Sequence, residues 1–522
     1  MRSIIVPLLF FASAGAAQNM PPSVAIVNVV LDQGAGTVTI TYDLSDPEGD
    51  ACAVWISASV DGGTTFLADV SNVTGAVGSG IAPGSGLVAT WTYAGIPSIE
   101  STLVRVTAED GHAPDIQSMV DQVDGQLLAE RLEQVAILRH HQSAPAGLAA
   151  VRDTLWDTFE RAGFQRTATP VPLGGFQADN IQGRQPGLVN EASTFIVDAH
   201  YDAVAAAPGA DDNATGVAAT LEIARILSGY SFKHSLRYIG FAFEEQGLIG
   251  SQYHVLNATP AWEVVNGVLN MEMIGFYSDA PNSQQVPAGF DILFPTATAS
   301  IAADEYRGNF LTVVGNTASQ PLIDAYLAAA ADHVPALRTI ALAVPGNGEI
   351  APDLRRSDHA VFWEAGRQAL MLTDGSNFRN PNYHTPNDVI GTIDLDFLTN
   401  CTKATLAAAA RLAEPVNAGR DVYDLANAVG IHEHHDFPCS AEVFPNPVKD
   451  RLFIRLGDCI QEQVIAELFD LQGRKIAGGL LRSTGNGVLH ELATPILLNG
   501  THLLVLRSGG SVITMKVEVD RP

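Results

Sequence analysis

A histidine and several carboxylates stand close together in the chain, in three short groups between residues 199 and 247. The groups are Ala199–Asp202, Gly209–Asn213 and Phe243–Gly247, and each sits at the end of an apolar run. Zinc binds the nitrogen of histidine and the oxygens of carboxylates readily. The groups therefore predict a site for a divalent metal and a hydrolytic reaction.

The chemistry of a two-metal site explains these residue types. Two zinc ions about 3.5–4 Å apart need a ligand that bridges them, and a carboxylate has two oxygens for that purpose. Each ion also needs roughly two further protein ligands and a position left open for water. Binding lowers the pKa of that water from about 15.7 towards about 7, so an unligated glutamate nearby can take its proton.

Apolar segments predict the elements that must hold these groups. Thr194–Ala199, Leu236–Phe243 and Val268–Met271 read as strands, whereas Gly216–Leu227 has helical spacing. Strands and helices alternate from about residue 122 to about residue 413. This alternation favours an α/β sheet with helices on both faces.

The candidate side chains follow the predicted strands, where such sheets bind ligands. His200 follows the first strand, Glu244 and Glu245 the second, and Glu272 the third. Taken singly, each has a structural explanation, such as a solvated loop carboxylate or, for the Asp-Asp-Asn run, a helix cap. Their joint position predicts that they converge on one edge of the sheet.

Five motifs make this region resemble the zinc-dependent M28 peptidases, the family of bacterial leucyl-type aminopeptidases and glutamate carboxypeptidase. They are Ala199–Asp202, Pro208–Gly216, Ala242–Gly250, Leu269–Gly275 and Asn380–Asp388. The resemblance implies that residues 122–415 form a catalytic domain. Its fold would be a mixed, mostly parallel sheet flanked by helices, like that of zinc peptidases and phosphorylase-hydrolase-like proteins.

The resemblance also implies two Zn²⁺ ions and assigns their ligands. His200 and Glu272 would be terminal ligands of one ion, and Glu245 and His384 would bind the other. Asp212 matches the bridging carboxylate, with the adjacent Asp211 as its alternative. Many family members have aspartate where Glu272 stands, but glutamate still offers a carboxylate, so we expect it to bind.

Three further residues match family roles around the metals. Glu244 resembles the general acid/base, and Asp202 resembles the carboxylate that orients the ring of a ligating histidine. Tyr383 resembles a tyrosine of the carboxypeptidase relatives, with either a transition-state role or a packing role. The substrate-polarising tyrosine of some aminopeptidases has no clear match near Ser357–His359.

Other polar residues near the motifs have open interpretations. Arg355, Arg356 and Arg379 would suit a substrate carboxylate, or form salt bridges within loops. Asp358 and His359 either support the site from behind the ligands or have a structural role. The tract His432–Asp436 resembles a metal-binding sequence, but it falls in a predicted linker and is interpreted as an accidental polar run.

The N-terminal region predicts export followed by a β module. Residues 1–17 have a basic start, a short apolar core and small residues for cleavage, as an export signal does. Residues 21–118 show short strands between turn signals and loosely resemble immunoglobulin-like or fibronectin-like modules. We expect this module to act as a spacer or in binding, and residues 416–440 to be a linker.

The C-terminal region resembles the sorting domain of type IX secretion cargo. Val443–Val448 and Leu468–Lys475 carry the resemblance, which implies a β-sandwich over residues 441–522 and a secreted or cell-surface protein. Cys439 and Cys459 are the most plausible disulfide pair in this region. Cys52 and Cys401 are expected to be buried as small hydrophobic side chains.

Charge and hydropathy restrict the partners. The formal net charge of −28 repels phosphate backbones, so nucleic acid is not expected as a partner. No segment beyond the export signal reads as a transmembrane helix. The expected partners are peptide substrates and the type IX secretion machinery.

These observations predict an exported aminopeptidase that cleaves the first peptide bond of peptides. A carboxypeptidase or dipeptidase on the same scaffold is the nearest alternative, and a one-zinc glutaminyl cyclase is a third. A catalytically inactive surface binding protein would be favoured by a missing ligand or base, and none is missing.

Overall fold

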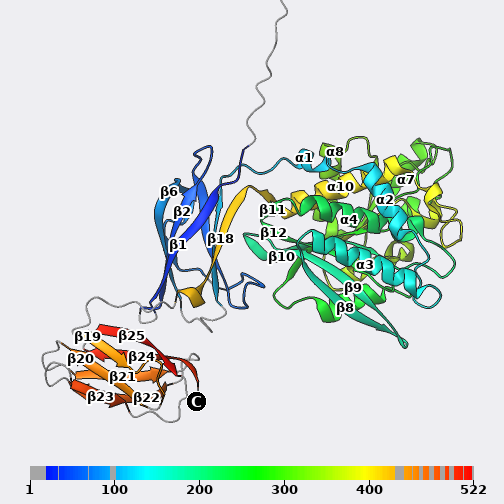
Figure 1. The fold of residues 1–522 in the computed structure, drawn as a ribbon. Coiled ribbons are helices and arrows are strands. Elements are labelled where there is room, and N and C mark those ends of the chain that lie inside the picture. The colour runs from blue at the N-terminus through cyan, green and yellow to red at the C-terminus, as the bar shows by residue number, and fades with distance from the viewer. Residues whose placement is uncertain are drawn as a thin grey trace, which may run out of the picture. The chain divides into compact units, whose positions relative to one another are not determined.

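The computed structural model divides the chain into two compact units, one ending at Asp424 and the other beginning at Leu425 (Figure 1). The expected export signal, the Cys439–Cys459 pair and the tract at 432–436 lie outside the described residues. The structure describes residues 19–32, 35–68, 70–93, 102–428, 440–449, 451–457, 463–469, 475–482, 488–492, 499–508 and 511–519.

An eight-stranded mixed sheet forms the centre of the first unit. Its strands run in the order β15-β14-β16-β13-β10-β12-β9-β8, and β12, β10, β13 and β16 are parallel neighbours. The strands are β8 Gln165–Leu173, β9 Phe176–Gln185, β10 Asn190–His200, β12 His234–Phe241, β13 Val264–Met271, β14 Leu311–Asn316, β15 Thr339–Val344 and β16 Ala369–Thr373.

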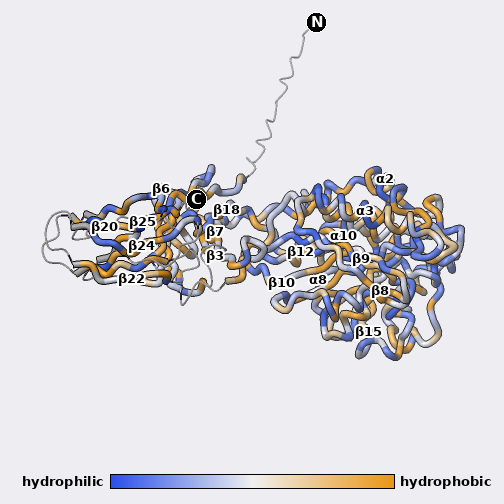
Figure 2. Tube along the Cα trace, turned by 60° about the horizontal axis from the view of Figure 1, so that its bottom comes forward, coloured by the Kyte–Doolittle hydropathy of each residue, from blue (hydrophilic) through white to orange (hydrophobic). Residues whose placement is uncertain are grey.

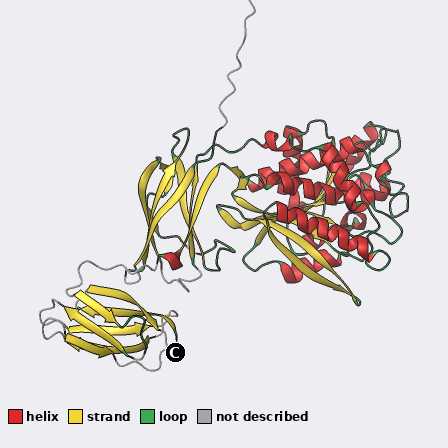
Figure 3. Ribbon diagram, in the orientation of Figure 1, coloured by secondary structure: helices red, strands yellow, loops and turns green. Residues whose placement is uncertain are grey.

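Helices gather around this sheet (Figure 3). Successive strand residues point to different apolar cores: Val197 and Leu269 pack with the helices α2, α3, α4, α8 and α10, whereas Ile196 and Val268 pack with α9. This arrangement confirms the predicted α/β fold with helices on both faces. The helices are α1 Ile116–Val120, α2 Gly125–Val135, α3 Pro145–Arg161, α4 Gly216–Leu227, α5 Ile249–Tyr253, α6 Phe290–Leu293, α7 Pro295–Ala303, α8 Gln320–His333, α9 His359–Glu364 and α10 Leu395–Ala413.

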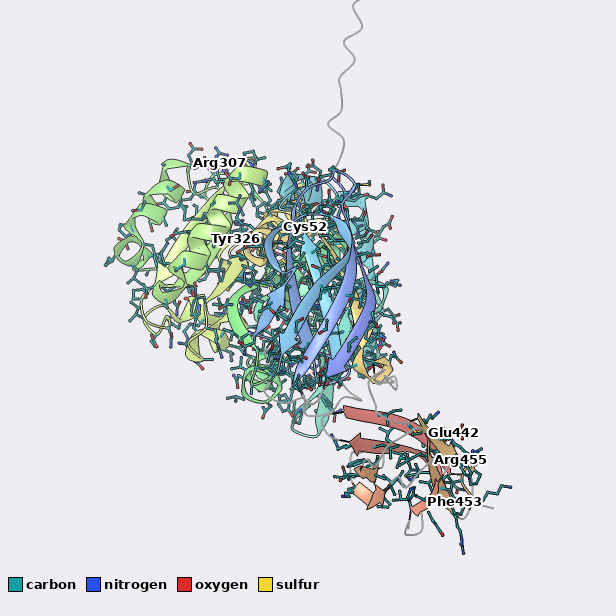
Figure 4. All side chains as sticks on the ribbon, turned by 90° about the vertical axis from the view of Figure 1, so that its left-hand side faces the viewer. Cys52, Arg307, Tyr326, Glu442, Phe453 and Arg455 are labelled. Atoms are coloured by element: carbon teal, nitrogen blue, oxygen red, sulfur yellow. The ribbon has the colours of Figure 1, made fainter. Side chains whose placement is uncertain are left out.

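Two further four-stranded sheets, built mainly from strands that precede the α/β part in the chain, belong to the same unit. One has the order β1-β2-β6-β4 and the other β18-β7-β3-β5. Cys52 lies on β3 among their strands, buried and free, as expected (Figure 4); Cys401 on α10 is also buried and free. The strands are β1 Ser23–Asp32, β2 Thr37–Ser45, β3 Cys52–Ser59, β4 Val73–Gly75, β5 Gly78–Ile81, β6 Gly84–Thr92, β7 Leu103–Glu109 and β18 Ala418–Asp424.

The strand β18 occupies the first part of the predicted linker at 416–440. Residues 418–424 pair with β7 in antiparallel register, and the Asp421 carboxylate accepts a hydrogen bond from the backbone N–H of Ile26 at 2.7 Å. The segment has little apolar alternation, because it is an edge strand held by backbone hydrogen bonds to a partner more than 300 residues earlier. The chain therefore returns to the N-terminal β module after the α/β part.

The second unit contains two antiparallel sheets, of three and four strands. Hydrophobic and hydrophilic residues interchange along its strands (Figure 2), and Leu452, Ile454, Leu468 and Leu504 are fully buried in its core. No helix among the described residues is long and apolar enough to cross a membrane. The strands are β19 Ser440–Phe444, β20 Leu452–Gly457, β21 Gln463–Phe469, β22 Lys475–Arg482, β23 Val488–Leu492, β24 Gly500–Ser508 and β25 Ser511–Val519.

Candidate metal centre

Four neighbouring strands deliver the candidate side chains to one edge of the sheet. His200 is the last residue of β10, and it lies opposite Phe241, the last residue of β12. Glu244 and Glu245 follow β12 directly, and Glu272 follows β13. Because β10, β12 and β13 are parallel, their carboxyl ends meet, as the sequence predicts.

One group of ligands surrounds the His200 ring. Its Nε2 lies 3.3 Å from a Glu272 oxygen, 3.3 Å from Asp212 Oδ1 and 3.9 Å from a Glu244 oxygen. Both ring nitrogens are buried and make no hydrogen bond. A buried nitrogen faced by carboxylate oxygens, without hydrogen-bonding geometry, fits a cation between them.

A second group surrounds the His384 ring, which comes from the loop after β16. Its Nε2 lies 3.1 Å from Asp212 Oδ2 and 3.1 Å from a Glu245 oxygen. The two oxygens of Asp212 therefore face two different histidines. This is the arrangement that a carboxylate bridging two metal ions requires.

The loop after β10 directs Asp212, and not Asp211, towards the histidines. The Asp211 carboxylate points away and accepts hydrogen bonds from the Gly275 N–H at 2.9 Å and from Asn380 Nδ2 at 2.7 Å. Asp388 accepts hydrogen bonds from the backbone N–H groups of both Asp211 and Asp212, at 2.9 and 3.1 Å. Groups distant in the chain, the Gly275 N–H and the side chains of Asn380 and Asp388, thus decide between the two aspartates.

Asp202 connects two parts of the site. Its Oδ1 lies 3.5 Å from His200 Nδ1, on the side of the ring away from the other carboxylates. The same carboxylate accepts hydrogen bonds from the backbone N–H groups of Glu244 and Glu245, at 3.1 and 3.3 Å. It can therefore fix the ring of one candidate ligand and the loop that carries two other acidic groups.

A buried arginine that sequence reasoning missed holds the Asp212 loop. Arg139 is 0% exposed and donates to the backbone oxygens of Tyr201 at 2.9 Å, Gly209 at 2.8 Å and Asp212 at 3.3 Å. It also donates to the carbonyls of Ile137 and Pro208. A single arginine between predicted helices gives no local signal of this role, because arginine is usually exposed.

Glu244, Glu245 and His384 hold protons strongly in the absence of a cation. Burial acts to raise the pKa of Asp212, but His200 and His384 outweigh it and hold that pKa below its ordinary value. Burial raises the pKa of Glu244 well above its ordinary value, and the Glu272 charge adds to this effect. Burial and the Asp212 charge raise the pKa of Glu245 to about 7. For His384, burial acts to lower the pKa, but Asp212 and Glu245 outweigh it and raise the pKa to about 10. A divalent cation would take the place of these protons.

Tyr383 lies at the mouth of the site. Its ring stacks on that of His384 with 3.8 Å between centroids, and its hydroxyl accepts a hydrogen bond from Arg356 at 2.8 Å. Arg356 also donates to Asn377 Oδ1 at 2.9 Å. These contacts fix the hydroxyl of Tyr383 beside the second histidine.

The arginines and the Asp358–His359 pair that the sequence analysis left open have the following contacts. Arg355 forms an ion pair with Glu364, and buried Arg379 donates a hydrogen bond to Gln284 at 2.8 Å. The His359 ring contacts the Leu354 carbonyl at 3.0 Å. Asp358 is fully buried, and burial raises its pKa to about 7.

An apolar pocket opens beside Glu272, Arg356 and Tyr383. Its cavity volume is about 80 Å³. Such a pocket suits an apolar side chain of a ligand. Its apolar walls include Val286, Phe290, Ile301, Phe310, Leu342 and Met371.

Sequence comparison places this site in a known family. The model of peptidase family M28 matches residues 180–409. A protein of Escherichia coli K12 described as uncharacterized protein YfbL is 31% identical over 248 residues, which are 44% of this chain and 70% of that protein. The chain belongs to peptidase family M28.

Other M28-like relatives carry functional names. A probable zinc metalloprotease of Pyrenophora teres f. teres is 24% identical, over 59% of this chain and 70% of that protein. Leucine aminopeptidase 1 of Trichophyton equinum is 26% identical, over 45% of this chain and 57% of that protein. These names support zinc as the metal of this M28 protein and a hydrolase of the metallopeptidase type as its enzyme class.

The C-terminal resemblance is also confirmed. The model of the secretion system C-terminal sorting domain matches residues 442–520, which cover most of the second unit. This match supports the type IX secretion machinery as a partner and a secreted or cell-surface location.

Proposed function

We propose that this M28 protein is an exported di-zinc aminopeptidase that hydrolyses the N-terminal peptide bond of peptides. The observation that carries the proposal is the position of Asp212, whose two oxygens each lie within 3.3 Å of a different histidine. The cleaved export signal predicted at residues 1–17 is part of the same proposal.

The donor set fits two zinc ions. His200 and Glu272 would hold one ion, Glu245 and His384 the other, and Asp212 both. Bound zinc would polarise the substrate carbonyl and acidify a water molecule. Histidine nitrogen and carboxylate oxygen are ligands that zinc accepts.

Glu244 is the general acid/base in this proposal. It is buried beside the first ligand group, and Asp202 holds the backbone N–H of Glu244. A carboxylate with a pKa raised by burial suits proton transfer at neutral pH. Glu244 would take a proton from the attacking water and return it to the leaving amine.

Tyr383 would stabilise the oxyanion that develops on the substrate. Burial raises the pKa of Tyr383 well above its ordinary value, so the hydroxyl stays a hydrogen-bond donor at neutral pH. The Arg356 guanidinium holds its oxygen in place. Donors fixed in advance around a developing charge are among the most effective catalytic devices.

The test compares blocked and free peptides. We expect the protein to cleave Leu-p-nitroanilide and short peptides with a free amino terminus. Acetylation of that amine should abolish cleavage. A chelator should abolish cleavage of Leu-p-nitroanilide and of the free peptides. Arg356 at the mouth favours one alternative, recognition of a substrate carboxylate by a carboxypeptidase or dipeptidase. Equal cleavage of acetylated and free peptides would support that alternative.

A further inference from the structure

A second cavity lies at the opposite end of strand β10 from the metal centre, between the N-terminal β module and the α/β part. Its cavity volume is about 410 Å³. Its walls come from β7 and β18 of the β module and from residues 162–165, 184–191 and 228–231. Glu191 in its wall and His200 at the metal centre are nine residues apart on β10, about 30 Å at the rise of a strand.

Positive charge dominates the lining of this cavity. Arg105, Arg184 and Arg420 line it, and Glu191 is the one acidic lining residue. Arg105 and Arg184 are each 4% exposed. In a chain with a formal net charge of −28, the lining of this cavity therefore carries two more positive than negative side chains.

The acidic groups near these arginines are already engaged. The Glu191 carboxylate lies 3.0 Å from Arg184 and 3.9 Å from Arg105, and it also accepts the backbone N–H of Phe66 at 3.1 Å. Glu263, another buried carboxylate, pairs with Arg237 at 2.7 Å. Neither carboxylate is free to neutralise Arg420.

Donors remain available on the lining arginines. The Nε of Arg184 is buried and makes no hydrogen bond, and no hydrogen bond or ion pair engages the exposed Arg420 among the described residues. Arg105 pairs with Val422 across the β7–β18 ladder, so Arg420 lies diagonally from Arg105 on the same face. Diagonal neighbours are about 7–8 Å apart, within joint reach of one small anion.

The surplus charge is not relieved by loss of a proton. Burial lowers the pKa of Arg105 to about 10, and the Arg420 charge contributes in the same direction. The Arg105 guanidinium is therefore still protonated at neutral pH. Buried guanidinium groups without a counter-charge are costly, whereas a bidentate oxyanion matches their planar fork.

We propose that this cavity binds a small oxyanion, a carboxylate or phosphate group, among Arg420, Arg105 and Arg184. Thr64 and Ser231 line the same cavity and offer further polar contacts. Because Arg420 belongs to the β module and Arg184 to the central sheet, the bound anion would connect the two parts. The site is far from the metal centre, so its ligand has no part in peptide hydrolysis.

The test is calorimetric titration of the full chain with inorganic phosphate and, separately, with succinate. We expect one saturable site for at least one of the two anions. Arg420→Gln should weaken that binding about 10–100-fold, the effect of losing a charge-assisted hydrogen bond. Because Arg420 is exposed and unpaired, this variant should keep the wild-type Tm without ligand and the wild-type kcat/KM.

Arg367→Gln is the matched control, since it removes the same charge from a residue that does not line the cavity. This variant should bind the anion as the wild type does. Binding of phosphate alone would identify a phosphate site, and binding of succinate alone a carboxylate site. No saturable binding of either up to about 20 mM, or equal losses in the two variants, would overturn the proposal.

Discussion

The metal centre and the arginine cavity are charge clusters of opposite sign at opposite ends of strand β10. The acidic cluster relieves its surplus charge by holding protons, since Glu245 has a pKa raised to about 7 and His384 one raised to about 10. Arginine has no such route at neutral pH, because burial lowers the pKa of Arg105 only to about 10. A metal thus competes with protons, whereas an anion at the arginines competes only with water.

The largest effect is expected from Glu244→Gln, which separates metal binding from proton transfer in the acidic cluster. The amide keeps the size of the side chain but does not accept a proton from water. We expect kcat to fall about 10²–10⁴-fold, while the zinc content stays that of the wild type. Turnover close to wild type, measured with Leu-p-nitroanilide, would remove Glu244 from the mechanism.

Tyr383→Phe tests the hydroxyl at the mouth of the metal centre. Phenylalanine keeps the stacking on His384 but removes the donor. Loss of one oxyanion donor lowers kcat about 10²–10³-fold, and we expect KM and Tm to change little. A variant with unchanged kcat would leave Tyr383 with a packing role only.

Arg139→Met tests a buried arginine that donates its hydrogen bonds to backbone carbonyls. The arginines of the second cavity, in contrast, have donors that no described protein group accepts. The change leaves those carbonyls without a donor and moves the Asp212 loop. Zinc affinity should fall roughly 10–100-fold, as when a partner behind metal ligands is lost. Competition with a chromogenic chelator measures this affinity.

Arg139→Lys is the control for charge. Lysine keeps the positive charge near Asp212 but not the planar fork, so it should recover only part of the zinc affinity. Wild-type affinity in both variants would show that the loop does not depend on Arg139.

The smallest expected effect is a pH dependence of the metal-free protein. Glu245 and His384 both have raised pKa values in the folded state, so the folded state binds protons more strongly than the unfolded state. Their stabilising contribution is complete at low pH. As the pH rises, the contribution of Glu245 is lost between about pH 4.5 and 7, and that of His384 between about pH 6.5 and 10.

Thermal melts in chelator at pH 6, 8 and 10 measure this dependence. Tm should fall as the pH rises, and excess zinc should weaken the fall, because the metal replaces the protons. A Tm that rises over this range in chelator would contradict the proposed proton binding by the cluster.

The convergence of the acidic residues could be predicted from sequence, but their fine arrangement could not. His200 and Glu272 follow apolar runs, and parallel strands bring such positions to one edge. The choice between Asp211 and Asp212 depends on the Gly275 N–H and on Asn380, which lie far away in the chain. Local sequence does not contain that information.

The arginine cavity shows the same limit more strongly. Arg420 lies in a segment predicted to be a linker, yet it belongs to a strand that pairs with β7. Arg105, Arg184 and Glu191 come from three other strands, and no motif unites them. Pairing of the edge strand β18 with the distant strand β7 helps to create this site, and such pairing leaves little trace in local hydropathy.

The most direct test of the central claim is the zinc content of the purified full-length chain, measured by mass spectrometry together with activity. If Asp212 bridges two ions, the active protein should contain two zinc ions per chain, and Asp212→Asn should lose both zinc and activity. Full activity with one zinc ion or none, or an Asp212→Asn variant that keeps two, would contradict the account.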